Sequence, residues 1–400
     1  MHIYIHIPFC IRKCSYCGFY SVIFNQELKC CFIDSLINEI DIYGHHFLDR
    51  NKLDCVDNLH NTLYIGGGTP SLLEFKDSQA IVNALNKSFA ISAFDEFTIE
   101  TNPDSLTESK LDGYRKLGVN RVSIGIQSLN DNILNSLGRV HDSAQAQNAL
   151  QIAAGSGIRR ISADLIYSIP GLETASFLKN IERVIELGAT HISLYSLTVE
   201  PGTKIEKDVL SNKVRIPDTD TIAAQYYAAS ESLESLGFAA YEVSNFAQAG
   251  EESQHNMAYW TGESFFGFGP SAHSFCKNIR WANTLDVSKY IDAFSSEKLR
   301  IGDSHFGNNP ESFLKKAGLP LDFAETLTRK DRITEIVMLG LRLRKGFSID
   351  TLGDFAKTII DTATPLFKNG ILLYDGKSIK LAPGKRLLAD AVAVKLVEII

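Results

Sequence analysis

The chain has 400 residues, of which 44% are hydrophobic, and its formal net charge is −7 at pH 7. That length predicts two domains or one large barrel with an extension. The acidic balance argues against broad nucleic-acid binding, and no apolar run reaches the ~18 residues that a membrane helix needs. Seven cysteines, with no stretch typical of a signal peptide, favour a reducing compartment.

Strand-like and helix-like patterns alternate along the first 240 residues. The expected strands are 2–7, 62–66, 96–101, 121–126, 160–167 and 191–197. The expected helices are 25–42, 77–89, 109–117, 143–156, 176–187 and 219–236. Strand, crossover helix, strand is the pattern of a parallel sheet, so the chain predicts an α/β fold, either a partial (β/α)6 TIM-like barrel or a doubly wound open sheet.

The ends of the expected strands favour the barrel, because chemistry gathers at the C-terminal ends of barrel strands. Polar or glycine-rich groups follow all six strands, at 10–17, 66–70, 100–103, 123–128, 164–171 and 195–203. We therefore expect these groups to share one rim.

Beyond residue 240 the alternation fades. Helical patterns return at 310–317, 332–344, 349–355 and 362–369, followed by β-like segments at 371–374 and 378–381 and a last helix at 384–400. Helices followed by a small hairpin suggest a winged-helix-like fold. The expected domains are a barrel (1–240), an extension (241–304) and a mostly helical C-terminal domain (305–400).

Three cysteines, Cys10, Cys14 and Cys17, follow the first expected strand. Three thiolates can hold three irons of a [4Fe-4S] cluster, which leaves the fourth iron open to S-adenosylmethionine. A structural zinc site usually has four ligands in two separated pairs, and no second C-x-x-C pair follows. The remaining cysteines are Cys30, Cys31, Cys55 and Cys276. Two alternatives remain. The three cysteines could bind zinc with His6 as the fourth ligand, or they could be three unrelated thiols that bind no metal.

The predicted rim carries groups that suit a polar cofactor. The glycine run at 66–68 lets the backbone approach a ligand closely. Carboxylates accept hydrogen bonds from hydroxyl or amine groups, an amide donates and accepts, and a guanidinium pairs with a carboxylate. The side chains with these properties are Glu100, Gln127, Arg139 and Asp164. Each alone is typical of a turn or a cap, whereas together they predict a binding site.

A second group of side chains, at 255–260, combines His255 with Tyr259 and Trp260. A neutral imidazole is a ligand for haem iron, and aromatic rings could pack on a flat macrocycle. Met257 is an alternative axial ligand, and a packed His255 that binds nothing is the simplest alternative.

Taken together, the chain resembles the HemW family, the haem chaperones related to oxygen-independent coproporphyrinogen III dehydrogenase. The C-x3-C-x2-C spacing alone indicates only the radical SAM superfamily. The resemblance covers almost the whole chain, and its matching segments are 4–17, 66–71, 100–103, 123–128, 137–141, 164–167, 241–246, 255–260 and 338–342. The loop after the fifth strand departs from the family pattern at 168–169 and 172–173.

The resemblance implies a radical SAM barrel in which Cys10, Cys14 and Cys17 ligate the cluster. His255 matches the histidine implicated in haem binding, and no residue is assigned a catalytic role. Residues that match S-adenosylmethionine contacts in the dehydrogenase relatives are Tyr4, Gly67, Gly68, Thr69, Glu100, Gln127, Arg139 and Asp164, and Tyr16 of the cysteine loop is counted with them.

The dehydrogenases carry a fourth cysteine two residues after the third, and Phe19 occupies that position here. The resemblance therefore implies a haem chaperone that hands haem to respiratory proteins, with the cluster and S-adenosylmethionine governing transfer or dimerisation. The expected location is the cytoplasm, with peripheral contact at the membrane, and no nucleic-acid partner is expected. Oxygen-independent coproporphyrinogen III dehydrogenase is the alternative function, and radical modification of RNA is a more distant one.

Overall fold

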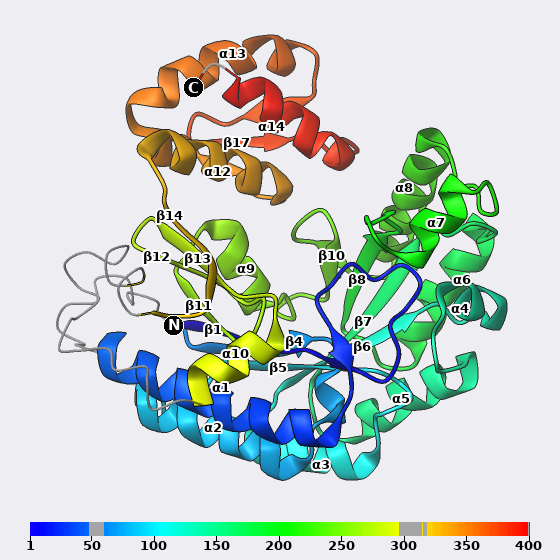
Figure 1. Cartoon of the computed structure of the whole chain (residues 1–400). Helices are drawn as coiled ribbons and strands as arrows, with labels where there is room; N and C mark the ends of the chain where they lie inside the picture. The colour runs from blue at the N-terminus through cyan, green and yellow to red at the C-terminus, as the bar shows by residue number, and fades with distance from the viewer. Residues whose placement is uncertain (48–59, 296–313, 315–317, 399) are drawn as a thin grey trace.

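The computed structural model describes residues 1–47, 60–295, 314, 318–398 and 400 (Figure 1). In this part of the chain, a twelve-stranded mixed sheet is covered on its outer face by helices, and a small C-terminal unit follows. Cys55 and the predicted helix at 310–317, apart from Leu314, lie outside the described residues. None of the described helices is long and apolar enough to cross a membrane.

Six parallel strands follow one another in chain order within the sheet. They are β1 (His2–Ile7), β4 (Thr62–Gly67), β5 (Glu96–Thr101), β6 (Arg121–Gln127), β7 (Arg160–Tyr167) and β8 (His191–Ser196). Each strand pairs in parallel with the next one in this order. A doubly wound sheet reverses its order near the middle, which this sheet does not do. The prediction of a partial (β/α)6 barrel is therefore confirmed.

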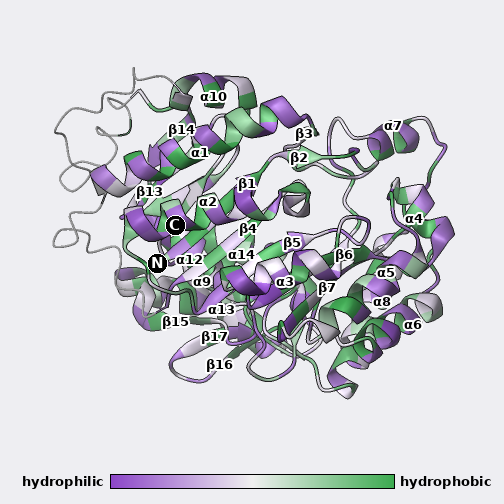
Figure 2. Ribbon diagram, turned by 90° about the horizontal axis from the view of Figure 1, so that it is seen from below, coloured by the Kyte–Doolittle hydropathy of each residue, from purple (hydrophilic) through white to green (hydrophobic). Residues whose placement is uncertain are grey.

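The crossover helices begin and end within a few residues of their predicted positions. They are α1 (Gln26–Phe47), α2 (Phe75–Phe89), α3 (Glu108–Leu117), α5 (Ser143–Gly155), α6 (Thr174–Glu186) and α8 (Thr219–Ser235). Figure 2 shows them banded in green and purple, as expected for helices that bury one face. Two helices of seven residues, α4 (Asp131–Leu137) and α7 (Lys204–Leu210), were not predicted because they are too short to show a helical period.

Side chains along β1 alternate between two environments. Ile3, Ile5 and Ile7 are fully buried in the apolar core beneath the helices. Tyr4 and His6 point to the opposite face, where the Tyr4 hydroxyl lies 3.0 Å from His6 Nδ1. The same alternation in the other strands gives the barrel a polar interior, which we call the lumen and which includes Tyr64, Thr98, Ser123, Ser162 and Ser193.

The segment from residue 239 onward extends the sheet at both edges, which the sequence did not predict. At one edge, β10 (Asn245–Ala247) lies beside β8 and β9 (Ala239–Ala240) lies beside β10. At the other edge, β11 (Phe265–Phe268) lies beside β1, followed by β12 (His273–Cys276), β13 (Ile279–Asn283) and β14 (Leu321–Thr326). β14 lies between the expected helices at 310–317 and 332–344, where no strand was predicted, and it is held by antiparallel pairing with β13, a contact that local patterns do not encode.

The extension also contains two helices, α9 (Gln254–Thr261) and α10 (Val287–Ser295). The last part of the chain has its own apolar core, which includes Val337, Leu341, Leu352, Ile379 and Leu396. Its main elements are α12 (Arg329–Arg342), α13 (Ala356–Lys368), α14 (Ala389–Val397) and a three-stranded sheet of β15 (Phe347–Ser348), β16 (Leu372–Tyr374) and β17 (Ser378–Leu381). The mostly helical C-terminal fold agrees with the prediction, whereas the boundaries at 240 and 304 stay predictions.

Glu39 of α1 is a fully buried carboxylate that joins the helical layer to the sheet extension. Its Oε2 accepts hydrogen bonds from the Gly269 amide (2.8 Å) and the Tyr290 hydroxyl (2.5 Å), and its Oε1 accepts one from Asn283 Nδ2 (2.6 Å). Burial raises the pKa of Glu39 to about 7, although these three donors oppose the shift.

We expect Glu39 to make the fold less stable as the pH rises. Because its folded pKa lies above the ordinary 4.5, the folded state binds more protons between pH 4.5 and 7, and the free energy of unfolding falls through that window. When the pH is raised from about 5 to about 8, the free energy of unfolding should fall by roughly 2 kcal/mol less in Glu39→Gln than in the wild type. Urea unfolding at both pH values measures the difference, and equal losses in the two proteins would contradict the expectation.

Candidate functional site

The three cysteines lie on a loop at the C-terminal end of β1. Short parallel strands, β2 (Phe9–Cys10) and β3 (Val22–Ile23), close this loop at its base. Its tip is held at Ser15, whose amide donates to the Leu137 carbonyl (3.0 Å) and whose carbonyl accepts from the Ile205 amide (2.9 Å). The loop is therefore fixed by the segments that follow β6 and β8, so its shape depends on the whole barrel.

The thiols of Cys10, Cys14 and Cys17 are free and partly buried. Burial is the main cause that raises the pKa of the Cys17 thiol, and the neighbouring Cys14 and Cys10 thiols add to the increase, whereas a hydrogen bond from the Phe19 backbone opposes it. Within the described ranges, no three His, Cys, Asp or Glu side chains converge where one metal ion could sit. A cubane cluster does not need such convergence, since each thiolate binds a different iron.

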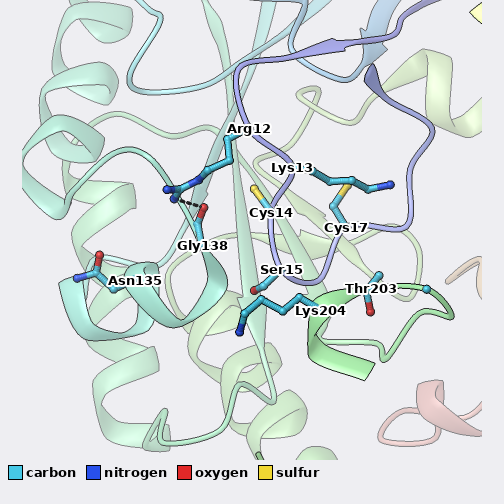
Figure 3. Close-up of a pocket in the computed structure, with 10 residues that line it drawn as sticks. Arg12, Lys13, Cys14, Ser15, Cys17, Asn135, Gly138, Thr203 and Lys204 are labelled. Atoms are coloured by element: carbon cyan, nitrogen blue, oxygen red, sulfur yellow. Dashed lines mark hydrogen bonds between the residues drawn. The ribbon is translucent and has the colours of Figure 1, made fainter. Parts of the chain in front are cut away.

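A cavity of about 530 Å³ adjoins the cysteine loop (Figure 3). It is lined by Arg12, Lys13, Cys14, Ser15, Cys17, Asn135, Gly138, Gly202, Thr203 and Lys204. Arg12 also donates from Nη2 to the carbonyls of Gly138 (2.5 Å) and Arg139 (2.9 Å). Arg12, Lys13 and Lys204 were not among the predicted site residues. The positive charges of Arg12 and Lys13 within the cysteine motif were an available signal, whereas Lys204 reaches the cavity only through the fold.

The glycine run at the end of β4 packs against β1 and the cysteine loop. Gly67 has a φ of +110°, and a Cβ there would lie 2.7 Å from the His6 ring. A Cβ at Gly68 would lie 2.6 Å from the Phe9 carbonyl oxygen. Thr69 donates from its hydroxyl to Cys10 Sγ at 3.7 Å. These glycines are thus required for the local fold, and substitution there would disturb more than a ligand.

Two half-buried carboxylates at the rim have raised pKa values. Glu100 accepts from the Tyr64 hydroxyl (2.7 Å) and the Gly67 amide (3.0 Å), and Asp164 accepts from the Ser123 hydroxyl at 3.2 Å. Burial raises the pKa of Glu100 to about 7 and that of Asp164 to about 6. Both groups are short of compensating positive charge, so a ligand with donor groups would be stabilised beside them.

Arg139 connects the rim to the cysteine loop. Its Nη1 donates to Cys14 Sγ (3.6 Å), and its Nη2 donates to Asn102 Oδ1 (2.7 Å) and the Gly125 carbonyl (3.0 Å). Among the described residues, nothing accepts from its buried Nε. Asn102 Nδ2 in turn donates to the Thr69 hydroxyl (3.1 Å). Asn102 is a rim residue that the predicted set lacked, although it follows Glu100 at the end of β5.

Gln127, Tyr16 and Tyr4 occupy different parts of this region. Gln127 ends β6 with a φ of +63°, an unfavourable conformation for a residue with a side chain and one that is common at functional sites. Tyr16 lies in the cysteine loop, where burial is the main cause of its raised pKa and Arg139 opposes it. Tyr4 lies in the lumen beside His6. The structure thus gathers the predicted cofactor residues at the C-terminal end of the barrel and in the adjoining lumen.

His255 lies at the other end of the barrel. Its Nδ1 is 2.7 Å from the hydroxyl of Thr62, the first residue of β4, whereas the cysteines follow the last residue of β1. Its Nε2 is 2.8 Å from the Tyr259 hydroxyl, and the side chain is buried. Both ring nitrogens are therefore engaged within the protein. The haem-ligand role of His255 stays a prediction, and these contacts do not favour it.

Comparison with known proteins agrees with this geometry. The Radical SAM superfamily matches residues 4–184. A solved structure described as "Coproporphyrinogen III oxidase (HemN) from Escherichia coli is a Radical SAM enzyme" covers 100% of this chain, and the match spans 90% of that chain, with a TM-score of 0.79. At 22% sequence identity, this likeness shows the fold alone.

Curated relatives match nearly the whole chain. The protein called Heme chaperone HemW from Mycobacterium tuberculosis (strain H37Rv) is 32% identical over 390 residues, which cover 98% of this chain and 93% of the relative. The protein of that name from Bacillus subtilis (strain 168) is 30% identical over 399 residues, covering 97% of each. A third, from Lactococcus lactis (strain IL1403), is 30% identical and covers 94% and 92%. With the cysteine loop and partial barrel in place, these matches show that the chain belongs to the HemW family of radical SAM proteins.

Proposed function

We propose that this protein is a haem chaperone that binds haem and delivers it to haem-requiring proteins. The observation that carries the proposal is identity of 30–32% over nearly the full length to proteins called Heme chaperone HemW. The respiratory nature of the acceptor, its place at a membrane and any pairing of two copies stay predictions. The alternative, radical oxidative decarboxylation of coproporphyrinogen III, is supported only by a likeness of fold.

The cysteine loop fits a [4Fe-4S] cluster. Cys10, Cys14 and Cys17 lie on one loop, are partly buried and are free of disulfides. They would hold three irons and leave the fourth to S-adenosylmethionine. When bound, the two cofactors supply one-electron chemistry, and the part of the protein is to hold and orient them.

The rim fits the polar groups of S-adenosylmethionine. Glu100 and Asp164 would accept from its hydroxyl or ammonium groups, which would reduce the cost of keeping these carboxylates buried. Arg139, beside Cys14, has an Nε donor with no acceptor among the residues that the structure describes. The further proposed contacts are Tyr4, Tyr16, Gly67, Gly68, Thr69 and Gln127.

Replacement of a loop cysteine should abolish the cluster. After anaerobic reconstitution, Cys14→Ala should lack a full complement of iron and sulfide, because one of the three thiolates is missing. Cys31→Ala, which changes an exposed cysteine of α1, should match the wild type. Iron and sulfide analysis measures the loss, and S-adenosylmethionine should perturb the EPR spectrum of the reduced wild-type cluster. A full cluster in Cys14→Ala, or bound zinc without sulfide, would refute the assignment.

Binding of S-adenosylmethionine should strengthen as the pH rises through about 7. Glu100 loses its proton in that range, and its charged form accepts hydrogen bonds better. Glu100→Gln should bind about tenfold more weakly at pH 8 and show a flatter pH dependence. Glu39→Gln is the matched control, because burial also raises the pKa of Glu39 to about 7, and its hydrogen-bond partners are Gly269, Tyr290 and Asn283 of the sheet extension rather than rim residues. Calorimetric titration measures the affinities, and identical profiles in Glu100→Gln and the wild type would remove Glu100 from the site.

Haem, and not coproporphyrinogen III, should be the tetrapyrrole that this protein handles. Phe19 stands at the position of the additional dehydrogenase cysteine, and its side chain is 71% exposed. Haem titration of the reconstituted protein should shift the Soret band. Incubation with coproporphyrinogen III, S-adenosylmethionine and a reductant should yield no protoporphyrinogen IX. Robust conversion would overturn the chaperone proposal in favour of the dehydrogenase.

A further inference from the structure

A line of contacts crosses the lumen from His255 to the glycine run at the opposite end. The imidazole of His255 stacks on the Tyr64 ring, with centroids 5.2 Å apart and an interplanar angle of 26°. The Tyr64 hydroxyl donates to Glu100 Oε1 (2.7 Å), and Glu100 Oε2 accepts from the Gly67 amide (3.0 Å). Four residues thus connect the helix that closes one end of the barrel to the rim at the other.

The His255 end of this line is held on several sides. Its ring nitrogens bond with Thr62 and Tyr259, and its backbone amide donates to Glu96 Oε1 (3.0 Å). Glu96 is itself fixed by a buried ion pair, 3.0 Å long, with Arg121. The imidazole is therefore a rigid support for the ring above it.

The rim end has little space for movement. A Cβ at Gly66 would lie 2.7 Å from Tyr64 Cε1 and 3.0 Å from Glu100 Oε1. Both side chains therefore lie directly against the backbone of the glycine run. A tilt of the Tyr64 ring would move its hydroxyl and shift the carboxylate that bonds Gly67.

We infer that His255 is a positioning residue for the S-adenosylmethionine rim, acting through Tyr64 and Glu100, and that it does not ligate haem iron. Loss of the imidazole leaves a cavity against the Tyr64 ring, and the ring can then relax into it. Without that support, Glu100 and the Gly67 backbone are no longer held in place. S-adenosylmethionine then has to order them when it binds, and this lowers its affinity. The inference rests on the proposed cofactor site.

The surroundings of His255 also argue against iron ligation. Burial lowers the pKa of this imidazole to about 3, so the ring is neutral, and both nitrogens have partners. A haem iron would have to displace Thr62 or Tyr259 and reach a side chain that is 1% exposed. His273, the first residue of β12, differs from His255 in both respects. Its side chain is exposed, and within the described residues its ring nitrogens have no hydrogen-bond partner.

The test compares S-adenosylmethionine affinity and haem spectra in reconstituted variants. His255→Ala and Tyr64→Phe should each bind S-adenosylmethionine about tenfold more weakly, as expected for a loosened hydrogen bond to a charged group. The Soret shift with haem and the EPR spectrum of the cluster without S-adenosylmethionine should match the wild type. Tyr43→Phe is the control, because it removes a buried tyrosine hydroxyl that lies 3.1 Å from Trp281 Nε1, away from the lumen.

A double-mutant cycle separates positioning from a general loss of stability. If His255 acts through Tyr64, the double variant should bind S-adenosylmethionine about as weakly as either single variant. Fully additive losses, or wild-type affinity in His255→Ala, would overturn the inference, as would loss of the Soret shift in that variant. Failure of the wild type to bind S-adenosylmethionine would instead refute the proposed cofactor site. If His255→Ala does not fold, Tyr64→Phe alone tests the inference. Wild-type affinity for S-adenosylmethionine in that variant would overturn it.

Discussion

The alternation of side chains along six parallel strands is the constraint on which the site depends. In β1, Ile3, Ile5 and Ile7 face the apolar core, so Tyr4 and His6 must face the lumen. A shift of one residue in register would exchange the two sets and bury polar groups beneath the helices. The apolar faces therefore fix the register, and the register in turn aims the rim carboxylates of β5 and β7 at the same space.

A polar lumen also has to be closed at the end away from the cysteines. Arg121, at the start of β6, donates to the carbonyls of Glu251 and Glu252 and pairs with Glu96. Glu96 also accepts from the Ser253 hydroxyl (3.0 Å). These contacts hold the beginning of α9 against the barrel. The segment that carries His255 therefore has a structural role in sealing the lumen, whatever it binds.

The sequence allowed the parts of the site that follow strand ends to be predicted. Glu100 and Asp164 belong to recognisable strands, and parallel strands bring their C-terminal ends together. Asn102 was missed as a site residue because its role depends on contacts with Thr69 and Arg139 that no spacing reveals. The location of His255 was equally hidden. Its aromatic neighbours suggested a flat ligand, whereas Tyr259 and Tyr64 in fact surround the imidazole itself.

The same burial that gives the rim its chemistry makes it unfavourable without a ligand. Burial in the lumen raises the pKa values of Glu100 and Asp164, because within the described part of the chain they have hydroxyl and amide donors but no cation in direct contact. Groups that bind there and donate hydrogen bonds stabilise the folded state in proportion to their affinity. A rigid support beneath Tyr64 increases that effect, because a carboxylate already in position needs no ordering when the ligand arrives. Cofactor affinity and the stability of the barrel are therefore linked through the same few side chains.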